Sequence, residues 1–319
     1  MKRLAVLTTG LMLAGCTGVD PMRGGNLWNS VAHVSNSAAS KNTRMIELPY
    51  FGQNLMVEDP SNSDYVGQTC RTPKMPLKPT GKGKLTGTVF VLDPGHGGKD
   101  TGAYWVENLP DGRKVAFWES AYSYAMTDKL SDMLRKEGAI VYLTAFSEVA
   151  SNSIPGSIEE PLPVPRDATS LWTNKSVVPK KPGWWERIHM GNDVYQRLKK
   201  DYKVVYLALH VDAMETRGWK GSHVLVKDMH HPPKIAKALA KRIQDEGIAR
   251  TQFGLPKPLI DRTRDLFLFR KTQNPNTILW EMALPQDAED SFRMRDEKSR
   301  EETARIALNA AIDFAQDAL

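Results

Sequence analysis

The chain has 319 residues, of which 41% are hydrophobic and 25% are charged, enough to build one sizeable core. A formal net charge of +6 is compatible with binding to a nucleic acid, a membrane surface or an anionic polymer. It is equally compatible with a protein that has no polyanionic partner. No RNP, helix-turn-helix or zinc-finger pattern is present in the sequence, so we expect no nucleic-acid partner.

Residues 1–15 have the pattern of a signal peptide. Lys2 and Arg3 precede a largely apolar stretch, Leu4 to Ala14, which is too short to span a bilayer.

The four residues that end this segment, Leu13-Ala14-Gly15-Cys16, resemble the lipobox of bacterial lipoproteins, in which the cysteine is acylated. We therefore predict lipidation of Cys16, which would anchor the protein in a membrane; the alternative is an ordinary signal peptide with an incidental cysteine. Thr17 follows rather than Asp, and by resemblance to Gram-negative lipoproteins this predicts a periplasmic protein anchored to the outer membrane. A soluble periplasmic or inner-membrane-anchored protein is the alternative. With Cys16 acylated, Cys70 has no intrachain partner, so we expect no disulfide.

Two segments follow this anchor. Residues 16–45 are rich in Gly, Asn and Ser and lack periodicity, as expected for a lipidated tether. Residues 46–87 form an N-terminal extension with several prolines, in which the pattern indicates only a short strand or two over 46–57.

Strands alternate with helices from Thr88 to the C-terminus. Strands are predicted at 88–94, 139–144, 203–210, 221–227, 266–271 and 277–283, and helices at 117–138, 185–201, 232–247 and 296–319. This alternation predicts an α/β fold, with a mostly parallel twisted sheet flanked by helices, in a single catalytic domain over 88–319.

A Pro- and Ser-rich loop at 151–185 is inserted into this domain and carries Trp172, Trp184 and Trp185. A loop of this length is usually functional or disordered. The three aromatic rings either stack on a sugar face or pin the loop to the body of the domain.

His96 lies among four glycines in the sequence VFVLDPGHGGKDTGAYW, residues 89–105. Glycine lets the backbone turn tightly and approach a ligand closely. Phosphate is excluded as that ligand, because Asp100 stands where a Walker loop needs Ser or Thr and where a dinucleotide fingerprint needs Gly. An imidazole and a carboxylate in one loop indicate a cation instead.

Three more candidate residues fall at the same edge of the predicted sheet. His210 and Glu281 lie at or near strand ends, and Glu119 follows the first strand near the start of a helix. His96, Glu119 and His210 supply two imidazoles and one carboxylate, a catalytic zinc set that leaves one position for water. We therefore predict one Zn²⁺ ion as the cofactor. Glu281 is predicted to accept the water proton and return it to the leaving amine.

Other polar residues have supporting roles in this hypothesis. Asp93 and Asp212 lie close to the two histidines in sequence, and we expect them to orient the imidazole rings as hydrogen-bond acceptors. The remaining histidines, at positions 33, 189, 223, 230 and 231, are expected to have structural or surface roles.

Four elements of the chain stand together in a recognisable order. They are LDPGHGGKDTGA at 92–103, Glu119, ALHVDA at 208–213 and LFLFRKTQNPNTILWEMA at 266–283. Together they resemble the zinc-dependent N-acetylmuramoyl-L-alanine amidases of the amidase type 3 family, which are cell-wall hydrolases, and the resemblance covers about 88–319.

The resemblance implies that His96, Glu119 and His210 hold zinc and that Glu281 is the catalytic carboxylate. It implies peptidoglycan as the substrate, with hydrolysis of the amide between N-acetylmuramic acid and L-alanine in cell-wall remodelling, cell separation or recycling. Whether an activator protein takes part is left open. Arg270 occupies the family's Leu-Arg position, where it either binds a substrate carboxylate or forms a structural salt bridge.

The chain also departs from the family pattern. Ala208 replaces the usual Ser, Thr144-Ala145 replaces Thr-Arg, and Ala283-Leu284 replaces Gly-Phe, while Arg187 and Asn192 restore a later Arg…Asn element. These changes affect the expected substrate detail and regulation more than metal binding, since all four proposed functional residues are present.

Two rival hypotheses stay open at this point. A binding module would hold the wall and the membrane together without chemistry, and a zinc peptidase would cut the stem peptide itself. Zinc content separates the first from an amidase, and the cleavage products separate the second.

Overall fold

The computed structural model describes the backbone of two strands at 43–47 and 54–58, and residues 77–109, 111–151, 161–171, 182–213, 218–262 and 266–317. The predicted signal peptide, the predicted lipidation site Cys16, Cys70 and Trp172 lie outside the described residues. The strands β1 (Thr43–Glu47) and β2 (Asn54–Glu58) pair as an antiparallel hairpin, close to the segment where one or two short strands were predicted.

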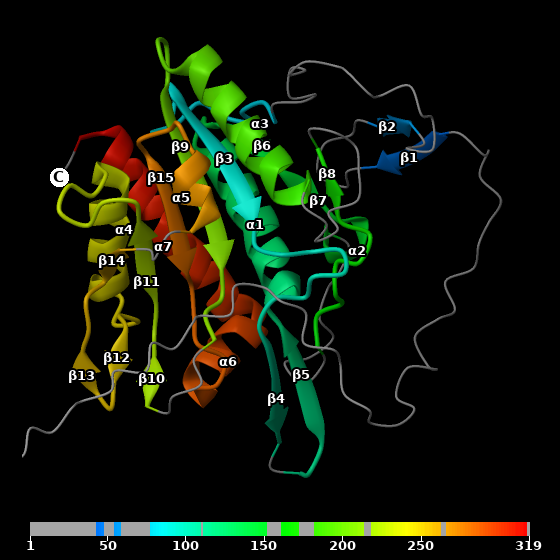
Figure 1. Cartoon of the computed structure of the whole chain (residues 1–319), viewed down its shortest axis with the longest axis vertical. Helices are drawn as coiled ribbons and strands as arrows, with labels where there is room; N and C mark the ends of the chain where they lie inside the picture. The colour runs from blue at the N-terminus through cyan, green and yellow to red at the C-terminus, as the bar shows by residue number, and fades with distance from the viewer. Residues whose placement is uncertain are drawn as a thin grey trace, which may run out of the picture. The chain divides into compact units, whose positions relative to one another are not determined.

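A six-stranded sheet with the strand order β14–β11–β15–β9–β3–β6 organises the remaining chain (Figure 1). Four neighbouring strands are parallel: β15 (Thr277–Glu281), β9 (Lys203–His210), β3 (Thr88–Pro94) and β6 (Ile140–Leu143). The two others, β11 (His223–Val226) and β14 (Ile260–Arg262), run antiparallel to them. The predicted α/β class with a mostly parallel sheet is confirmed.

Helices cover both faces of this sheet because its strands are apolar on both sides. On β3, Phe90 and Leu92 belong to one hydrophobic cluster and Val89 and Val91 to another, as the two-residue period of a strand requires. The first cluster packs against α1 (Glu119–Lys136), α4 (Lys234–Asp245) and α7 (Glu297–Ala315). The second packs against α3 (Pro182–Leu198) and α5 (Phe267–Lys271).

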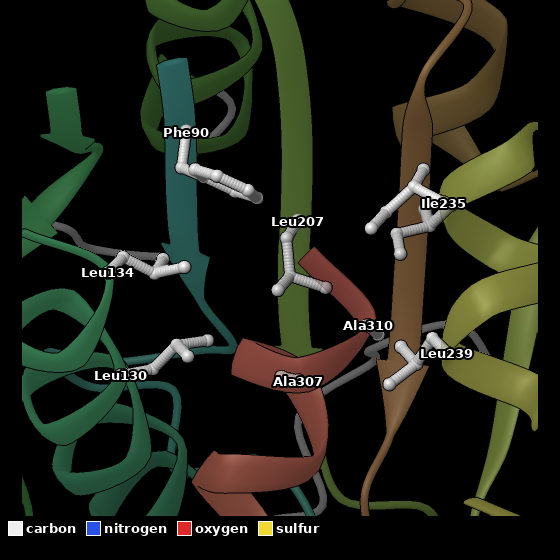
Figure 2. Close-up of a pocket in the computed structure, with 9 residues that line it drawn as sticks. Phe90, Leu130, Leu134, Leu207, Ile235, Leu239, Ala307 and Ala310 are labelled. Carbon is white, nitrogen blue, oxygen red and sulfur yellow. The ribbon is translucent and has the colours of Figure 1, made fainter. Parts of the chain in front are cut away.

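A small void lies in the first cluster, between the sheet and its helices (Figure 2). It measures about 10 Å³ and is lined by hydrocarbon side chains: Phe90, Leu130, Leu134, Leu207, Ile235, Leu239, Ile278, Ala307 and Ala310. A void that is so small and lacks polar partners is a packing gap rather than a ligand site.

The strand predicted at 266–271 is wrong, since Phe267–Lys271 forms the short helix α5. Short apolar runs do not distinguish a strand from a helix. The sheet also has no free position beside β15, which already pairs with β9 on one side and β11 on the other. Leu268 and Phe269 instead bury their side chains in the cluster below α3.

A hairpin that was not predicted lies between the glycine-rich loop and α1. Its strands are β4 (Tyr104–Asn108) and β5 (Lys114–Trp118), and it extends away from the carboxyl end of β3 (Figure 1). The helix predicted from residue 117 therefore begins at Glu119, because Phe117 and Trp118 complete the second strand.

The shorter elements complete the description. They are β7 (Ala145–Phe146), α2 (Glu148–Ser151), β8 (Thr169–Ser170), β10 (Trp219–Lys220), β12 (Thr251–Gln252), β13 (Leu255–Pro256) and α6 (Ala288–Arg295). Over the part of the chain that the structure describes, none of the helices combines the length and apolar character needed to span a bilayer.

Candidate metal centre

The loop after β3 places His96 in an unusual backbone conformation. Its φ of +61° lies in the left-handed region, which residues other than Gly adopt rarely. Two buried side chains hold this loop from below. Arg187 donates through Nη1 to the carbonyl oxygens of Pro94 (2.6 Å) and His96 (3.5 Å), and the Tyr124 hydroxyl donates to the His96 carbonyl at 3.4 Å.

Two glycines let the backbone come close to the side chains of the centre. Gly102 has a φ of +67°, and a Cβ there would lie 2.5 Å from Oε2 of Glu119. A Cβ on Gly95 would lie 2.7 Å from Nδ1 of His210. Any side chain at either position would collide with the site, which explains why the sequence has glycine there.

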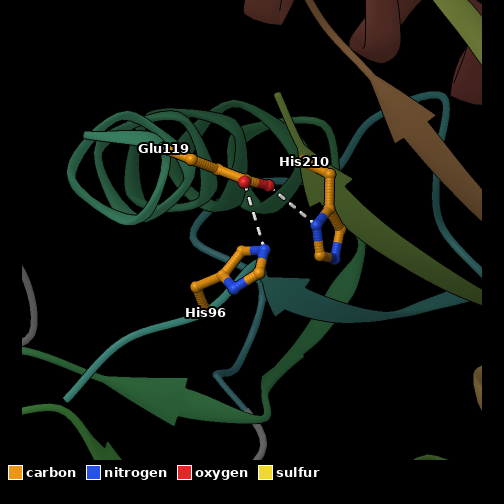
Figure 3. A group of neighbouring side chains, drawn as sticks. All are labelled: His96, Glu119 and His210. Carbon is orange, nitrogen blue, oxygen red and sulfur yellow. Dashed lines mark hydrogen bonds and ion pairs between the residues drawn. The ribbon is translucent and has the colours of Figure 1, made fainter. Parts of the chain in front are cut away.

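Glu119 lies between the two imidazoles (Figure 3). Its Oε2 is 3.1 Å from Nε2 of His96, and its Oε1 is 2.9 Å from Nδ1 of His210. The backbone N–H groups of Ala103 and Val211 also donate to the carboxylate, at 2.8 and 3.1 Å. One ligand atom from each of the three side chains lies within 4.8 Å of the others, so the group can hold a metal ion.

The charges around Glu119 explain how its carboxylate can be buried, with a side chain that is 5% exposed. Burial acts to raise the pKa of this carboxyl, but the two histidines outweigh it and hold the pKa below the ordinary value. Burial likewise acts to lower the pKa of His96, while the carboxylates of Glu119 and Asp100 raise it well above the ordinary value. A buried carboxylate is stable only beside positive charge, and a divalent cation on the same atoms would also supply it.

Glu281 is the register partner of His210 on the neighbouring strand β15. Its Oε2 is buried and has no hydrogen-bond partner among the described residues. Burial raises the pKa of Glu281 well above its ordinary value, and the negative charges of Asp212 and Glu119 raise it further. Glu281 is thus a half-buried acid with a buried Oε2, at the same edge of the sheet as the three ligand candidates.

The predicted orienting role of Asp93 is wrong. Its side chain leaves β3 toward α3, where its Oδ1 lies 3.2 Å from Nη1 of Arg187 and accepts a hydrogen bond from Thr144. Asp100 is the carboxylate beside the ring instead, with Oδ2 2.9 Å from Nδ1 of His96, a distance for an ion pair without the geometry of a hydrogen bond. The left-handed turn at His96 brings residue 100 back toward the imidazole, which the order of residues alone does not reveal.

The predicted orienting role of Asp212 beside His210 is also wrong. Its backbone N–H donates to the carbonyl of Ala283, and its Oδ2 lies 3.9 Å from Nη2 of Arg250. Burial raises the pKa of the Asp212 carboxyl, and Arg250 opposes that rise. His210 is positioned by its strand and by Glu119 instead.

The remaining predicted residues lie outside the centre. Arg270 is exposed on α5, 5.8 Å from the ring centroid of Phe267, and its role in substrate binding stays a prediction. Trp185 packs edge-to-face on Phe267, with ring centroids 4.6 Å apart, so this residue of the insertion is pinned to the body. His223 is buried on β11, where burial and then the charge of Arg250 lower its pKa to about 3, in keeping with a structural role.

Residues 90–313 match the profile of the protein family described as N-acetylmuramoyl-L-alanine amidase. The chain belongs to this amidase family. Membership supports hydrolysis of a peptidoglycan amide as its activity, and the cluster of His96, Glu119 and His210 is the group of described residues that can hold a metal.

Solved structures of amidases have a similar fold. The N-acetylmuramyl-L-alanine amidase Ami1 of Mycobacterium smegmatis is 17% identical, with a TM-score of 0.50 over 73% of this chain and 99% of that one. AmiC2 of Nostoc punctiforme is 18% identical, with a TM-score of 0.47 over 74% and 99%. CwlD of Clostridioides difficile, solved in complex with the GerS lipoprotein, is 17% identical, with a TM-score of 0.48 over 73% and 100%. No curated protein sequence gives a significant match to this chain.

Proposed function

We propose that this member of the amidase family is zinc-dependent and hydrolyses the amide between the lactyl group of N-acetylmuramic acid and L-alanine in peptidoglycan. One observation carries the proposal. A buried carboxylate, Glu119, contacts two imidazoles from distant parts of the chain, and a fourth group, Glu281, lies beside His210 on the next strand.

The donor atoms suit zinc. Two imidazole nitrogens and one carboxylate from His96, His210 and Glu119 form the three-ligand set of many catalytic zinc sites, which keep one position open. A zinc ion held there would supply a Lewis acid that polarises the scissile carbonyl and makes water nucleophilic near neutral pH.

Glu281 performs the proton transfers in this proposal. Its Oε2 has no hydrogen-bond partner among the described residues, which leaves it available to accept the proton of the attacking water. The same atom then returns the proton to the nitrogen of the leaving L-alanine.

Metal content and product analysis test the proposal together. Dialysis against a chelator is expected to abolish cleavage of muropeptides, and one equivalent of zinc is expected to restore it. Mass spectrometry should find a free peptide with L-alanine at its N-terminus. Cleavage inside the stem peptide would instead favour a zinc peptidase, and a protein that takes up no zinc would favour a binding module.

Glu281→Gln tests the assigned proton acceptor. The variant is expected to bind zinc like the wild type and to lose turnover by about 10²- to 10⁴-fold, since the amide cannot accept the proton. Turnover at the wild-type rate with full zinc occupancy would remove Glu281 from the mechanism.

We also propose that Cys16 carries a lipid that anchors the protein to the outer membrane, facing the periplasm. Support comes from the sequence Leu13-Ala14-Gly15-Cys16 and from Thr17 after it. Cells fed a labelled fatty acid should label the wild type and not Cys16→Ser, and fractionation should recover the wild type with outer-membrane vesicles. A wild type without label would refute the anchor and leave the amidase proposal intact.

A further inference from the structure

Two aromatic rings lie one above the other on the β4–β5 hairpin. Tyr104 and Trp118 are register partners on the two strands, with ring centroids 4.3 Å apart and ring planes inclined by 33°. Trp118 is half-buried and packs against the main core, whereas Tyr104 is 51% exposed. The pair therefore presents an open aromatic surface with a rigid support behind it.

The opposite face of the hairpin fixes it to the body. Phe117 is buried and stacks on Tyr122 with ring centroids 4.1 Å apart. Glu107 accepts hydrogen bonds from Arg295 (2.6 Å) and Ser291 (2.9 Å) on α6. Because successive residues of a strand point to opposite faces, Tyr104 and Trp118 lie on the other face, where Trp118 packs against the main core and Tyr104 is exposed.

Both residues of this aromatic pair are next to residues of the metal centre in the chain. Ala103, directly before Tyr104, donates its N–H to Oε2 of Glu119 at 2.8 Å. Trp118 directly precedes Glu119 itself, and neighbouring Cα atoms are about 3.8 Å apart. A substrate group that extends one sugar ring beyond the metal centre can therefore reach the pair.

We propose that Tyr104 and Trp118 form a platform that stacks on a pyranose ring of the glycan next to the scissile amide. This inference rests on the proposed function, because that amide joins the lactyl group of a sugar to the peptide, and the sugar must lie beside the centre during the reaction. The C–H face of a pyranose is flat and apolar and matches an open aromatic ring. The carboxylates of a stem peptide would instead require cationic partners.

Two substrates with the same scissile amide separate the platform from the chemistry. One is N-acetylmuramoyl-L-alanyl peptide, and the other is the corresponding D-lactoyl-L-alanyl peptide, which lacks the sugar. Tyr104→Ala is expected to lower kcat/KM for the sugar-bearing substrate by about tenfold, chiefly through KM, and to leave the sugar-free substrate unchanged. Tyr104→Phe keeps the ring and is expected to behave like the wild type.

Phe292→Ala provides the matched control, since Phe292 is an aromatic residue of similar exposure (47%) on α6. It is expected to leave both substrates unaffected. Zinc content of every variant is measured alongside. Saturation-transfer NMR with the peptide-free disaccharide of N-acetylglucosamine and N-acetylmuramic acid should show weaker binding to Tyr104→Ala than to Tyr104→Phe.

Each remaining outcome contradicts the platform. Equal losses of kcat/KM on both substrates would mean that Tyr104 acts through the loop that carries His96. Unchanged kinetics on both substrates would mean that Tyr104 contacts no sugar. In either case wild-type cleavage would still uphold the amidase proposal. A wild type that cleaves neither substrate when loaded with zinc would end the proposed function, and the platform with it.

Discussion

His96 and His210 face the same carboxylate, yet the fold holds them in opposite ways. His210 is the last residue of β9, between β3 and β15, and its carbonyl accepts the N–H of Met282 at 2.9 Å. His96 lies beyond the end of β3 in a left-handed conformation, and the side chains of Arg187 and Tyr124 hold its carbonyl. One ligand candidate is thus placed by the sheet and the other by side chains around a loop. Substitutions away from the sheet should therefore disturb His96 selectively.

The largest effect is expected from Arg187→Met. This change leaves Asp93 buried without its cationic partner and frees the carbonyls of Pro94 and His96. Removing one partner of a buried ion pair typically lowers the free energy of unfolding by about 3–5 kcal/mol. Urea denaturation measures that loss, and a zinc-binding titration should show weaker affinity because His96 is no longer held.

Arg197→Met, on the same helix, is the control. Arg197 is 44% exposed and pairs with Asp193 one turn away, where an ion pair contributes about 0–1 kcal/mol. If the two variants lose the same stability and bind zinc equally well, Arg187 does not position His96.

Gly102→Ala should give the next largest effect. The added Cβ would lie 2.5 Å from Oε2 of Glu119 and 2.6 Å from Cδ2 of His96, so the loop or the ligands must move. We expect zinc affinity to fall by more than about 100-fold, since a site geometry tolerates little displacement of its groups. Isothermal titration with zinc measures the change.

Gly87→Ala isolates the backbone strain in that experiment. Gly87 also has a positive φ, +86°, but a Cβ there meets no atom within 4 Å. Both variants should lose about 1–2 kcal/mol of stability through strain, and zinc affinity should fall in Gly102→Ala alone. Unchanged zinc affinity in Gly102→Ala would mean that the loop around His96 adapts freely.

The parallel strands were the most predictable part of the fold. The strands 88–94 and 203–210 match β3 and β9 to the residue, because strands buried on both faces appear as continuous apolar runs. The segment 266–271 was predicted as a strand and is the helix α5, since only the pairing of β15 with both neighbours reveals that no place is left. The β4–β5 hairpin was missed, although Pro110-Asp111-Gly112 between two apolar runs is a turn pattern.

The sequence allowed us to predict which residues form the site, but not which side chains hold them in place. Carboxyl ends of parallel strands meet at one edge, so His210 and Glu281 were expected to lie together, and they are register partners. The roles of Arg187 and Asp100 depend on geometry that spacing does not contain. Arg187 reaches the loop across 91 residues of sequence, and Asp100 meets His96 through a turn in which His96, Gly97 and Gly98 all have a positive φ.

Asp100→Asn should give the smallest effect, and it compares the two imidazoles most directly. Oδ2 of Asp100 lies 2.9 Å from Nδ1 of His96, whereas Asp212, even closer to its histidine in sequence, lies beside Arg250 instead. Losing a carboxylate that orients a metal-ligating imidazole typically weakens metal affinity by about 10- to 100-fold. We therefore expect such a loss in Asp100→Asn and none in Asp212→Asn, measured as zinc dissociation constants. Equal losses would mean that His210 depends on side-chain support as well, and the contrast between a sheet-held and a loop-held ligand would fail.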